Sequence, residues 1–234
     1  MKKTLLMLVL LMTVTAASAQ YYPDGRPIPP SKRASYYNHR NNYDHYHDYG
    51  LGRTYYGFRV GLGVATVNSD ADDLDGGNAK TGLNVGFVVG TQLTDRAPLY
   101  FETGLYYTEK GGKGYHDGSK FTYGLNYLEV PLLLKYKYSV APDFTIEPFM
   151  GGYLACGVSG KIKDYGNREA YSSFDSDYDS SFKRFDGGLR LGCGFGFQML
   201  YLGVSYDIGL ANVGRSDFDD THTGTLNINV GVNF

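Results

Sequence analysis

The sequence lacks long apolar runs: after residue 20, no stretch is long enough to span about 30 Å of hydrocarbon as a helix. This excludes a protein held in a membrane by helices, but not one that crosses with strands, because such strands alternate apolar and polar residues. The chain also lacks an excess of positive charge, with 22 Lys and Arg against 24 Asp and Glu. That balance indicates neither nucleic-acid binding nor attraction to an anionic partner.

The first nineteen residues have the three parts of a cleavable secretory signal. Lys2 and Lys3 precede an apolar run from Leu5 to Val14, and the small residues Ala17-Ser18-Ala19 follow. This layout predicts a signal peptide over 1–19, with Gln20 as the first residue of the exported chain. The residue directly after the expected cut is Gln20 and not a cysteine, so we expect no lipoprotein anchor.

Residues 20–54 are rich in Pro, Asn, Tyr and His and have no apolar period, which predicts a flexible periplasmic arm. The arm contains the weak metal candidates His39, His45 and His47. Imidazole suits zinc, copper or nickel. Low-complexity arms often carry such residues without binding metal, so we predict no metal and no cofactor.

From residue 55 to 234 the chain shows eight runs in which apolar and polar residues alternate with a period of two. In the first run, Phe58, Val60 and Leu62 share one face, and Arg59 and glycines share the other. The content of 32 Gly, 23 Tyr and 13 Phe also favours strands over helices. The pattern predicts an all-β fold, an eight-stranded antiparallel up-and-down β-barrel that crosses a bacterial outer membrane.

The polar faces of these runs hold most of the glycines and isolated charges of both signs. A soluble barrel would turn its bulky apolar side chains inward, so the pattern is better explained by a lipid-facing apolar surface and a polar lumen. A soluble barrel that binds an apolar ligand remains the alternative fold. The expected lumen charges are Arg59, Glu102, Glu129, Lys135, Lys137, Glu147, Arg190 and Asp207.

Two functions of the lumen charges stay open: a polar track for ions or small solutes, or a plug of mutually neutralising pairs. Eight strands leave an interior that side chains just fill, which favours the plug. Burial in a narrow lumen requires these charges to pair.

The connections between the runs alternate in length. Long loops are expected near 68–80, 109–122, 159–184 and 211–223, with short turns between them. This alternation is typical of an outer-membrane barrel with long loops outside and both chain ends in the periplasm. The terminal Phe234 resembles the signal that the barrel-assembly machinery reads. Pro131 and Pro148 interrupt the strand pattern and predict bulges or bends.

Cysteine and histidine are scarce in the barrel. Cys156 and Cys193 are too far offset along their strands for a disulfide, so two free thiols are expected. His116 and His222 fall in predicted outer loops, and no hydrolytic motif surrounds them. We therefore predict that the protein is not an enzyme, with a rim enzyme acting on lipid or peptide as an alternative.

The segment Tyr127–Lys135, YLEVPLLLK, resembles a strand that is typical of the PorT-like outer-membrane β-barrel family (porin family) of the Bacteroidota. The flanking segments 102–107, 148–152 and 186–189 resemble the family's neighbouring strands. The resemblance covers about residues 55–234 and implies a fold similar to small OmpX-like barrels. The family is functionally broad, and one namesake takes part in a secretion system.

These observations lead to one principal hypothesis and its alternatives. The principal hypothesis is a non-enzymatic outer-membrane barrel with a plugged lumen, whose long extracellular loops make surface contacts or whose presence supports the envelope. The alternatives are a narrow pore, a rim enzyme, or an accessory protein of a secretion system. The expected partners are outer-membrane lipid, the barrel-assembly machinery during biogenesis, and an unidentified extracellular or secretion-system protein, with no nucleic acid.

Overall fold

The computed structural model describes residues 54–69, 74, 78–94, 97–116, 119–141, 143–165, 169–218 and 220–234. The expected signal peptide, nearly all of the arm, and His39, His45 and His47 lie outside these residues. Within them, no helix is long and apolar enough to cross a membrane.

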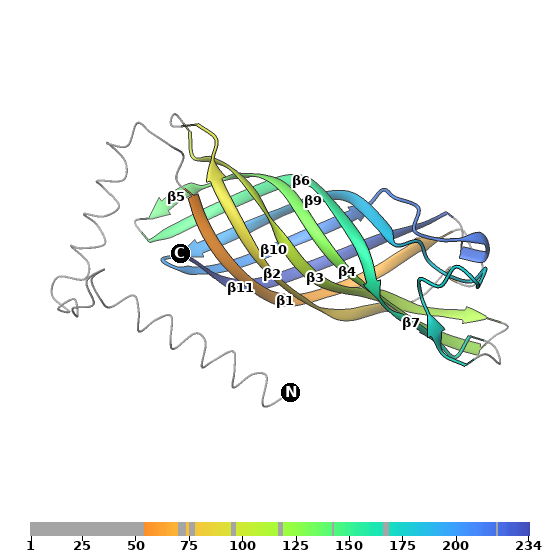
Figure 1. Ribbon diagram of the computed structural model, residues 1–234. Helices are drawn as coiled ribbons and strands as arrows, with labels where there is room; N and C mark the ends of the chain where they lie inside the picture. Colours follow the sequence, from red (N-terminus) through yellow and green to blue (C-terminus); the bar gives the residue numbers. More distant parts are fainter. Residues whose placement is uncertain are drawn as a thin grey trace, which may run out of the picture.

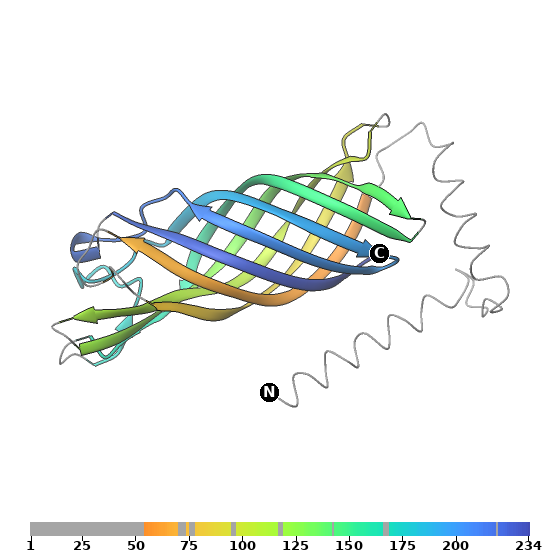
Figure 2. The same ribbon diagram turned by 180° about the vertical axis from the view of Figure 1, so that it is seen from behind.

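Eight long antiparallel strands close into a barrel in the described part of the chain, as the sequence predicts (Figure 1). The neighbour order β6-β9-β10-β11-β1-β2-β3-β4 closes because β4 also pairs with β6. Figure 2 shows the strands continuing around the far side. The strands are β1 (Thr54–Ser69), β2 (Asn78–Gln92), β3 (Leu99–His116), β4 (Ser119–Tyr136), β6 (Phe144–Ser159), β9 (Phe185–Phe197), β10 (Leu200–Gly209) and β11 (Thr221–Asn233).

Shorter elements decorate the two ends of the barrel. The strand β5 (Tyr138–Ala141) extends the end where β1 begins and the chain finishes, which we call the terminal end. The opposite, loop end carries β7 (Lys161–Lys163), β8 (Tyr171–Ser172) and the 3-10 helix η1 (Ser216–Phe218). At the terminal end, the backbone N–H of Phe234 donates to Tyr56 at 2.9 Å, and the N–H of Tyr56 donates back to Phe234.

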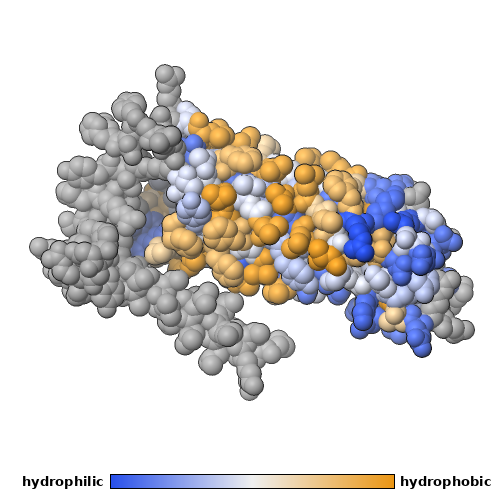
Figure 3. Space-filling model, viewed as in Figure 1, coloured by the Kyte–Doolittle hydropathy of each residue, from blue (hydrophilic) through white to orange (hydrophobic). Residues whose placement is uncertain are grey.

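The two faces of each strand differ as the alternation predicts. On β4, Leu132 is 41% exposed and its neighbour Leu133 is 3% exposed. On β10, Leu202, Val204 and Ile208 face outward in the same way. Exposed hydrophobic residues on all eight strands form a belt around the barrel. On the face seen in Figure 3, hydrophilic residues gather toward the loop end. The belt is the surface that lipid would cover.

Replacing Leu132 with arginine tests whether this belt faces lipid. Leu132 lies midway along the outward row from Leu128 to Tyr136. A charge at the bilayer midplane is expected to cost a transmembrane barrel about 2–4 kcal/mol. The control is Thr122→Arg, on the same face of β4 but six residues beyond Leu128, where the cost should be close to zero. Denaturant unfolding in lipid vesicles measures both, and equal costs would contradict a lipid-facing belt.

Two local expectations about the strands are wrong. Most of 109–122, expected as a long loop, belongs to β3 and β4, which form a hairpin that extends past the barrel. The register runs unshifted through Pro131 and Pro148, so the expectation of a bulge at either proline is wrong, because each removes one donor without adding a residue. The register shifts instead between Ala79 and Asn84 and next to Asn126.

Both cysteines are free, as the strand offsets predict. Cys156 pairs with Phe185 and Cys193 pairs with Pro148, which places the two thiols at different levels of the β6–β9 ladder.

Candidate functional site

The most concentrated polar chemistry of the molecule lies inside the barrel, around Arg190 of β9. Its Nε donates to Asp207 Oδ1 at 2.5 Å, and its Nη2 donates to Asp207 Oδ2 at 2.7 Å. Nη2 also donates to Glu129 Oε1 at 2.5 Å. Arg190 and Asp207 are direct cross-strand partners in the β9–β10 ladder, so the strand register itself creates this bidentate pair.

A second cation, Lys110 of β3, extends the network toward the loop end. Its Nζ lies 3.0 Å from Asp186 Oδ2 and 3.4 Å from Glu129 Oε2. The Glu129 oxygen has no hydrogen bond, so its contact with Lys110 is an ion pair only. We call the five residues Lys110, Glu129, Asp186, Arg190 and Asp207 the Arg190 cluster; their charged side chains are at most 5% exposed.

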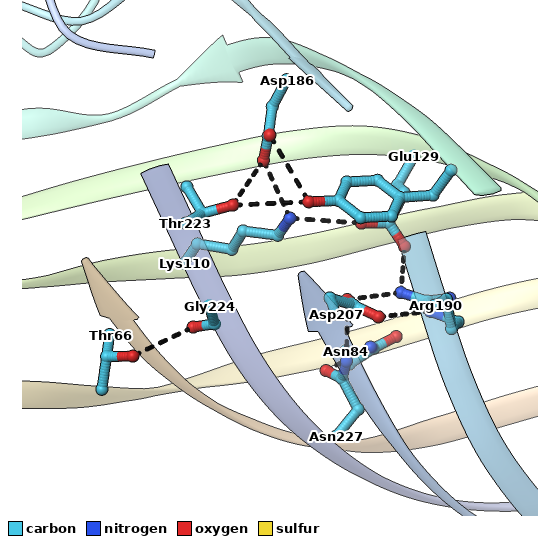
Figure 4. A network of polar contacts seen from close by, with 11 residues as sticks. Thr66, Asn84, Lys110, Glu129, Asp186, Arg190, Asp207, Thr223, Gly224 and Asn227 are labelled. Atoms are coloured by element: carbon cyan, nitrogen blue, oxygen red, sulfur yellow. Dashed lines mark hydrogen bonds and ion pairs between the residues drawn. The ribbon is translucent and has the colours of Figure 1, made fainter. Parts of the chain in front are cut away.

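Neutral side chains donate further hydrogen bonds to the carboxylates of this cluster (Figure 4). Asn227 Nδ2 donates to Asp207 Oδ2 at 3.0 Å, and Asn84 Nδ2 donates to Asn227 Oδ1 at 3.1 Å. Thr223 Oγ1 donates to Asp186 Oδ2 at 3.0 Å. The cluster is therefore one connected network that joins β2, β3, β4, β9, β10 and β11 across the lumen.

A second cluster lies closer to the terminal end, and we call it the Lys135 cluster. Lys135 Nζ donates to Glu102 Oε2 at 2.7 Å and lies 3.5 Å from Glu147 Oε2. Tyr55 OH donates to the same Glu102 oxygen at 2.5 Å. Lys137 Nζ lies 3.8 Å from Glu147 Oε1 and is 19% exposed, so it marks the terminal-end mouth of the lumen.

Arg59 departs from the expected pattern of charge pairs. The described residues provide it with no carboxylate within ion-pair distance. Instead, its guanidinium lies 3.8 Å from the centre of the Tyr201 ring. Nη2 donates to Asn233 Oδ1 at 2.5 Å, and Nη1 donates to the carbonyl of Val232 at 3.0 Å. A cation–π contact and oxygen acceptors replace the predicted ion pair.

The lumen charges balance when both clusters are taken with Arg59. Five cationic side chains face five carboxylates: Arg59, Lys110, Lys135, Lys137 and Arg190 against Glu102, Glu129, Glu147, Asp186 and Asp207. With every group in its usual charge state, the described residues of the lumen have no net formal charge. Such an interior stabilises itself through pairing and leaves no uncompensated charge to attract one sign of ion.

Aromatic side chains fill the loop end above the Arg190 cluster. On β4, Phe121, Tyr123 and Tyr127 point inward and are fully or almost fully buried. The Phe121 ring stacks on Phe218 with centroids 6.1 Å apart, and Tyr123 packs against Phe182 at 5.3 Å. These aromatic residues and their buried neighbours form one hydrophobic cluster, which we call the aromatic cap. Residues from the segment 171–182 and from η1 thus cover the loop end of the lumen.

Sequence reasoning located part of this site. The structure buries seven of the eight expected lumen charges and leaves the Lys137 side chain 19% exposed at the mouth. Lys110 and Asp186 are not among the expected lumen charges, because Lys110 falls in the expected loop 109–122 and Asp186 lies just past the expected loop 159–184. Extending the period of two by a few residues would have placed both on the inward face. The aromatic cap was missed because 159–184 was expected as a loop.

Comparison with known families decides which class of protein this is. Residues 30–215 match the family described as outer membrane protein beta-barrel domain. The chain belongs to this family. It is therefore an outer-membrane β-barrel, in agreement with the closed strands and the apolar belt. No curated protein matches the chain.

Solved structures of other outer-membrane barrels resemble this outer-membrane protein. Neisserial surface protein A is 15% identical, with 76% of this chain and 97% of the other covered and a TM-score of 0.48. OprG from Pseudomonas aeruginosa is 13% identical, covering 79% and 98%, with a TM-score of 0.46. The attachment invasion locus protein Ail of Yersinia pestis, in complex with the heparin analogue sucrose octasulfate, is 16% identical, covering 79% and 100%, with a TM-score of 0.41.

The other residues that the sequence singles out, the barrel histidines and Phe234, lie at the ends of this outer-membrane barrel. The His116 ring stacks on Tyr165 with centroids 4.3 Å apart, and His222 Nε2 lies 3.4 Å from Asp220 Oδ1. Phe234 is 63% exposed at the terminal end. Among the described residues, no group of three His, Cys, Asp or Glu side chains could hold a metal ion.

Proposed function

We propose that this protein is a non-enzymatic outer-membrane barrel with a plugged lumen that supports the envelope and presents its loop end to the cell exterior. The observation that carries the proposal is the buried set of lumen charges, which is formally neutral over both clusters and Arg59 and is capped by aromatic side chains. A solute path would need water along the lumen, whereas these side chains are buried from solvent and bonded to each other across it.

The proposed orientation places both chain ends in the periplasm. Short connections lie at the terminal end, and the extended β3–β4 hairpin with β7, β8 and η1 lies at the loop end. Long outer loops and short periplasmic turns are typical of such barrels. We also propose the PorT-like group of the Bacteroidota as the closer relationship, on the strength of the segment Tyr127–Lys135.

The absence of enzymatic activity is part of the proposal. His116 is occupied by aromatic stacking, and His222 is paired with an exposed carboxylate at the edge of the barrel. Neither arrangement resembles a nucleophile beside an oriented base. Substitution of either histidine should leave cell growth and envelope integrity unchanged. Outer-membrane lipid, the assembly machinery that would read Phe234, and an extracellular or secretion-system protein are the proposed partners.

Planar-bilayer recording tests the plug directly. The purified, folded protein should give no stable channels at low salt, because charge pairs and the aromatic cap fill the lumen. A wide barrel such as a general porin, recorded in the same bilayers, is the positive control. Heat-modifiable gel migration first establishes that the barrel is folded. Stable conductance steps from the wild-type protein would contradict the plug and favour the narrow pore.

A further inference from the structure

The outward face of the loop-end extension carries a concentration of lysines. The extension consists of the outer parts of β2, β3 and β4 together with β7. In the strand registers, Lys113 pairs with Thr122, and Thr122 pairs with Lys163, so these three side chains form one row across three strands. Directly opposed residues share a face of a sheet. Lys120 and Lys161 lie on the same face, two residues from Thr122 and Lys163 on their strands. The side chain of Lys80 reaches this face beside Gly124.

Burial shows that this row faces away from the lumen. Ile162, between Lys161 and Lys163, is fully buried and pairs with the buried Tyr123, whereas the two lysines are exposed. Lys120 is exposed as well. The row therefore continues the outward face of β4, which carries the apolar belt from Leu128 to Tyr136.

A glycine leaves space among these lysines. Gly111 pairs with Gly124 on this face, so neither strand has a side chain at that position. Lys80 Nζ lies 3.0 Å from the position that a Gly124 Cβ would occupy, and the backbone oxygen of Lys161 lies 3.9 Å from it. The Lys80 ammonium thus lies against the Gly124 backbone, beside the strand that carries Lys161 and Lys163.

Among the described residues, the lysines of this face have no ion-pair partners. None of the five lysines has a carboxylate within ion-pair distance among the residues that the structure places. The nearest outward carboxylate on β3 is Glu109, and its Oε2 accepts a hydrogen bond from the backbone N–H of Leu83.

The height of the lysines above the apolar belt matches the level at which lipid headgroups lie. Thr122, level with Lys113 and Lys163, lies six residues beyond Leu128, which is about 20 Å along a strand and about 15 Å along the membrane normal at the usual tilt. Lys80, beside Gly124, lies closer to the belt. We propose that this lysine face binds the phosphate groups of an anionic lipid in the outer leaflet. The proposal rests on the proposed orientation, which places the loop end outside.

Native mass spectrometry of the whole folded protein in zwitterionic detergent tests the lysine face, with bis-phosphorylated lipid A as the probe. A lysine near an anionic surface contributes about a fivefold gain in binding. The variant K113Q/K161Q/K163Q should therefore bind this lipid at least about tenfold more weakly than wild type at low salt. The matched variant K113R/K161R/K163R should stay within about twofold. Phosphatidylcholine should bind all three proteins weakly and equally.

The outcomes separate this inference from the orientation on which it rests. Lipid A binding that is unchanged in the glutamine variant, or equal to phosphatidylcholine binding in wild type, would overturn the lysine face. Inorganic phosphate that competes at millimolar concentration would identify free phosphate as the ligand and also overturn it. Separately, Lys120→Cys in a C156S/C193S background should react with an impermeant maleimide on intact cells. Failure to react, in a chain that shows heat-modifiable migration, would overturn the orientation and the inference with it.

Discussion

Replacing Arg190 with methionine should destabilise the folded barrel by about 3–5 kcal/mol. Methionine keeps much of the side-chain volume but removes the guanidinium that binds two carboxylates at 2.5–2.7 Å. Asp207 then keeps only the Asn227 amide, and Glu129 keeps only its ion pair with Lys110. The cost is high because a carboxylate remains buried without its partner. Denaturant unfolding in lipid vesicles measures the change.

Arg59→Met provides the matched control for this prediction. Arg59 is equally buried, but its loss leaves no carboxylate unpaired, because its partners are the Tyr201 ring and three neutral oxygens. Its cost should be about 1–2 kcal/mol, the scale of a cation–π contact and ordinary hydrogen bonds. The double variant R190M/D207N should recover part of the stability lost in R190M, because the unpaired charge of Asp207 is removed. Equal costs for R190M and R59M would show that pairing inside the lumen contributes little.

The fold was predictable because one physical rule governs the whole barrel. A strand that separates lipid from a polar lumen must alternate, so Leu132 and Leu133 could be expected to differ in exposure only once the neighbouring charges fixed the inward face. The same rule brought Glu129 and Lys135 from one run, and Arg190 from another, to the lumen. The face of a strand on which a residue lies depends only on nearby residues of the same strand, which is why a single sequence reveals it.

The pairing inside the lumen could not be predicted in the same way. Which carboxylate binds Arg190 depends on the register and stagger of strands that are distant in sequence. The alternation of apolar and polar residues determines neither the register nor the stagger. Arg59 shows the consequence: its place on the inward face was predictable, but its position over the Tyr201 ring was not. The aromatic cap depends on loop segments that have no period, so Phe182 and Phe218 gave no signal.

A second large effect is expected from Gly151→Ala, at the seam where β4 closes the barrel against β6. Gly151 pairs with Leu133 on one side and with Arg190 on the other. A Cβ at this position would lie 2.0 Å from the Leu132 carbonyl oxygen and 2.9 Å from the Leu133 Cα. Both atoms belong to the backbone, so relief requires β4 and β6 to separate and to lose ladder hydrogen bonds. The variant should fail to give the heat-modifiable folded form after refolding into lipid vesicles.

Gly152→Ala is the control, because the two glycines are adjacent and differ mainly in the face to which a side chain would point. A Cβ on Gly152 would meet only the Gly188 carbonyl oxygen, at 3.4 Å, which is an ordinary contact. This variant should fold with a denaturation midpoint close to that of wild type. If G151A folds as well as G152A, the β4 backbone can accommodate a Cβ at Gly151, and the predicted clash is wrong. Failure of both would instead indicate that the seam requires the flexibility of glycine on either face, whichever way a side chain points.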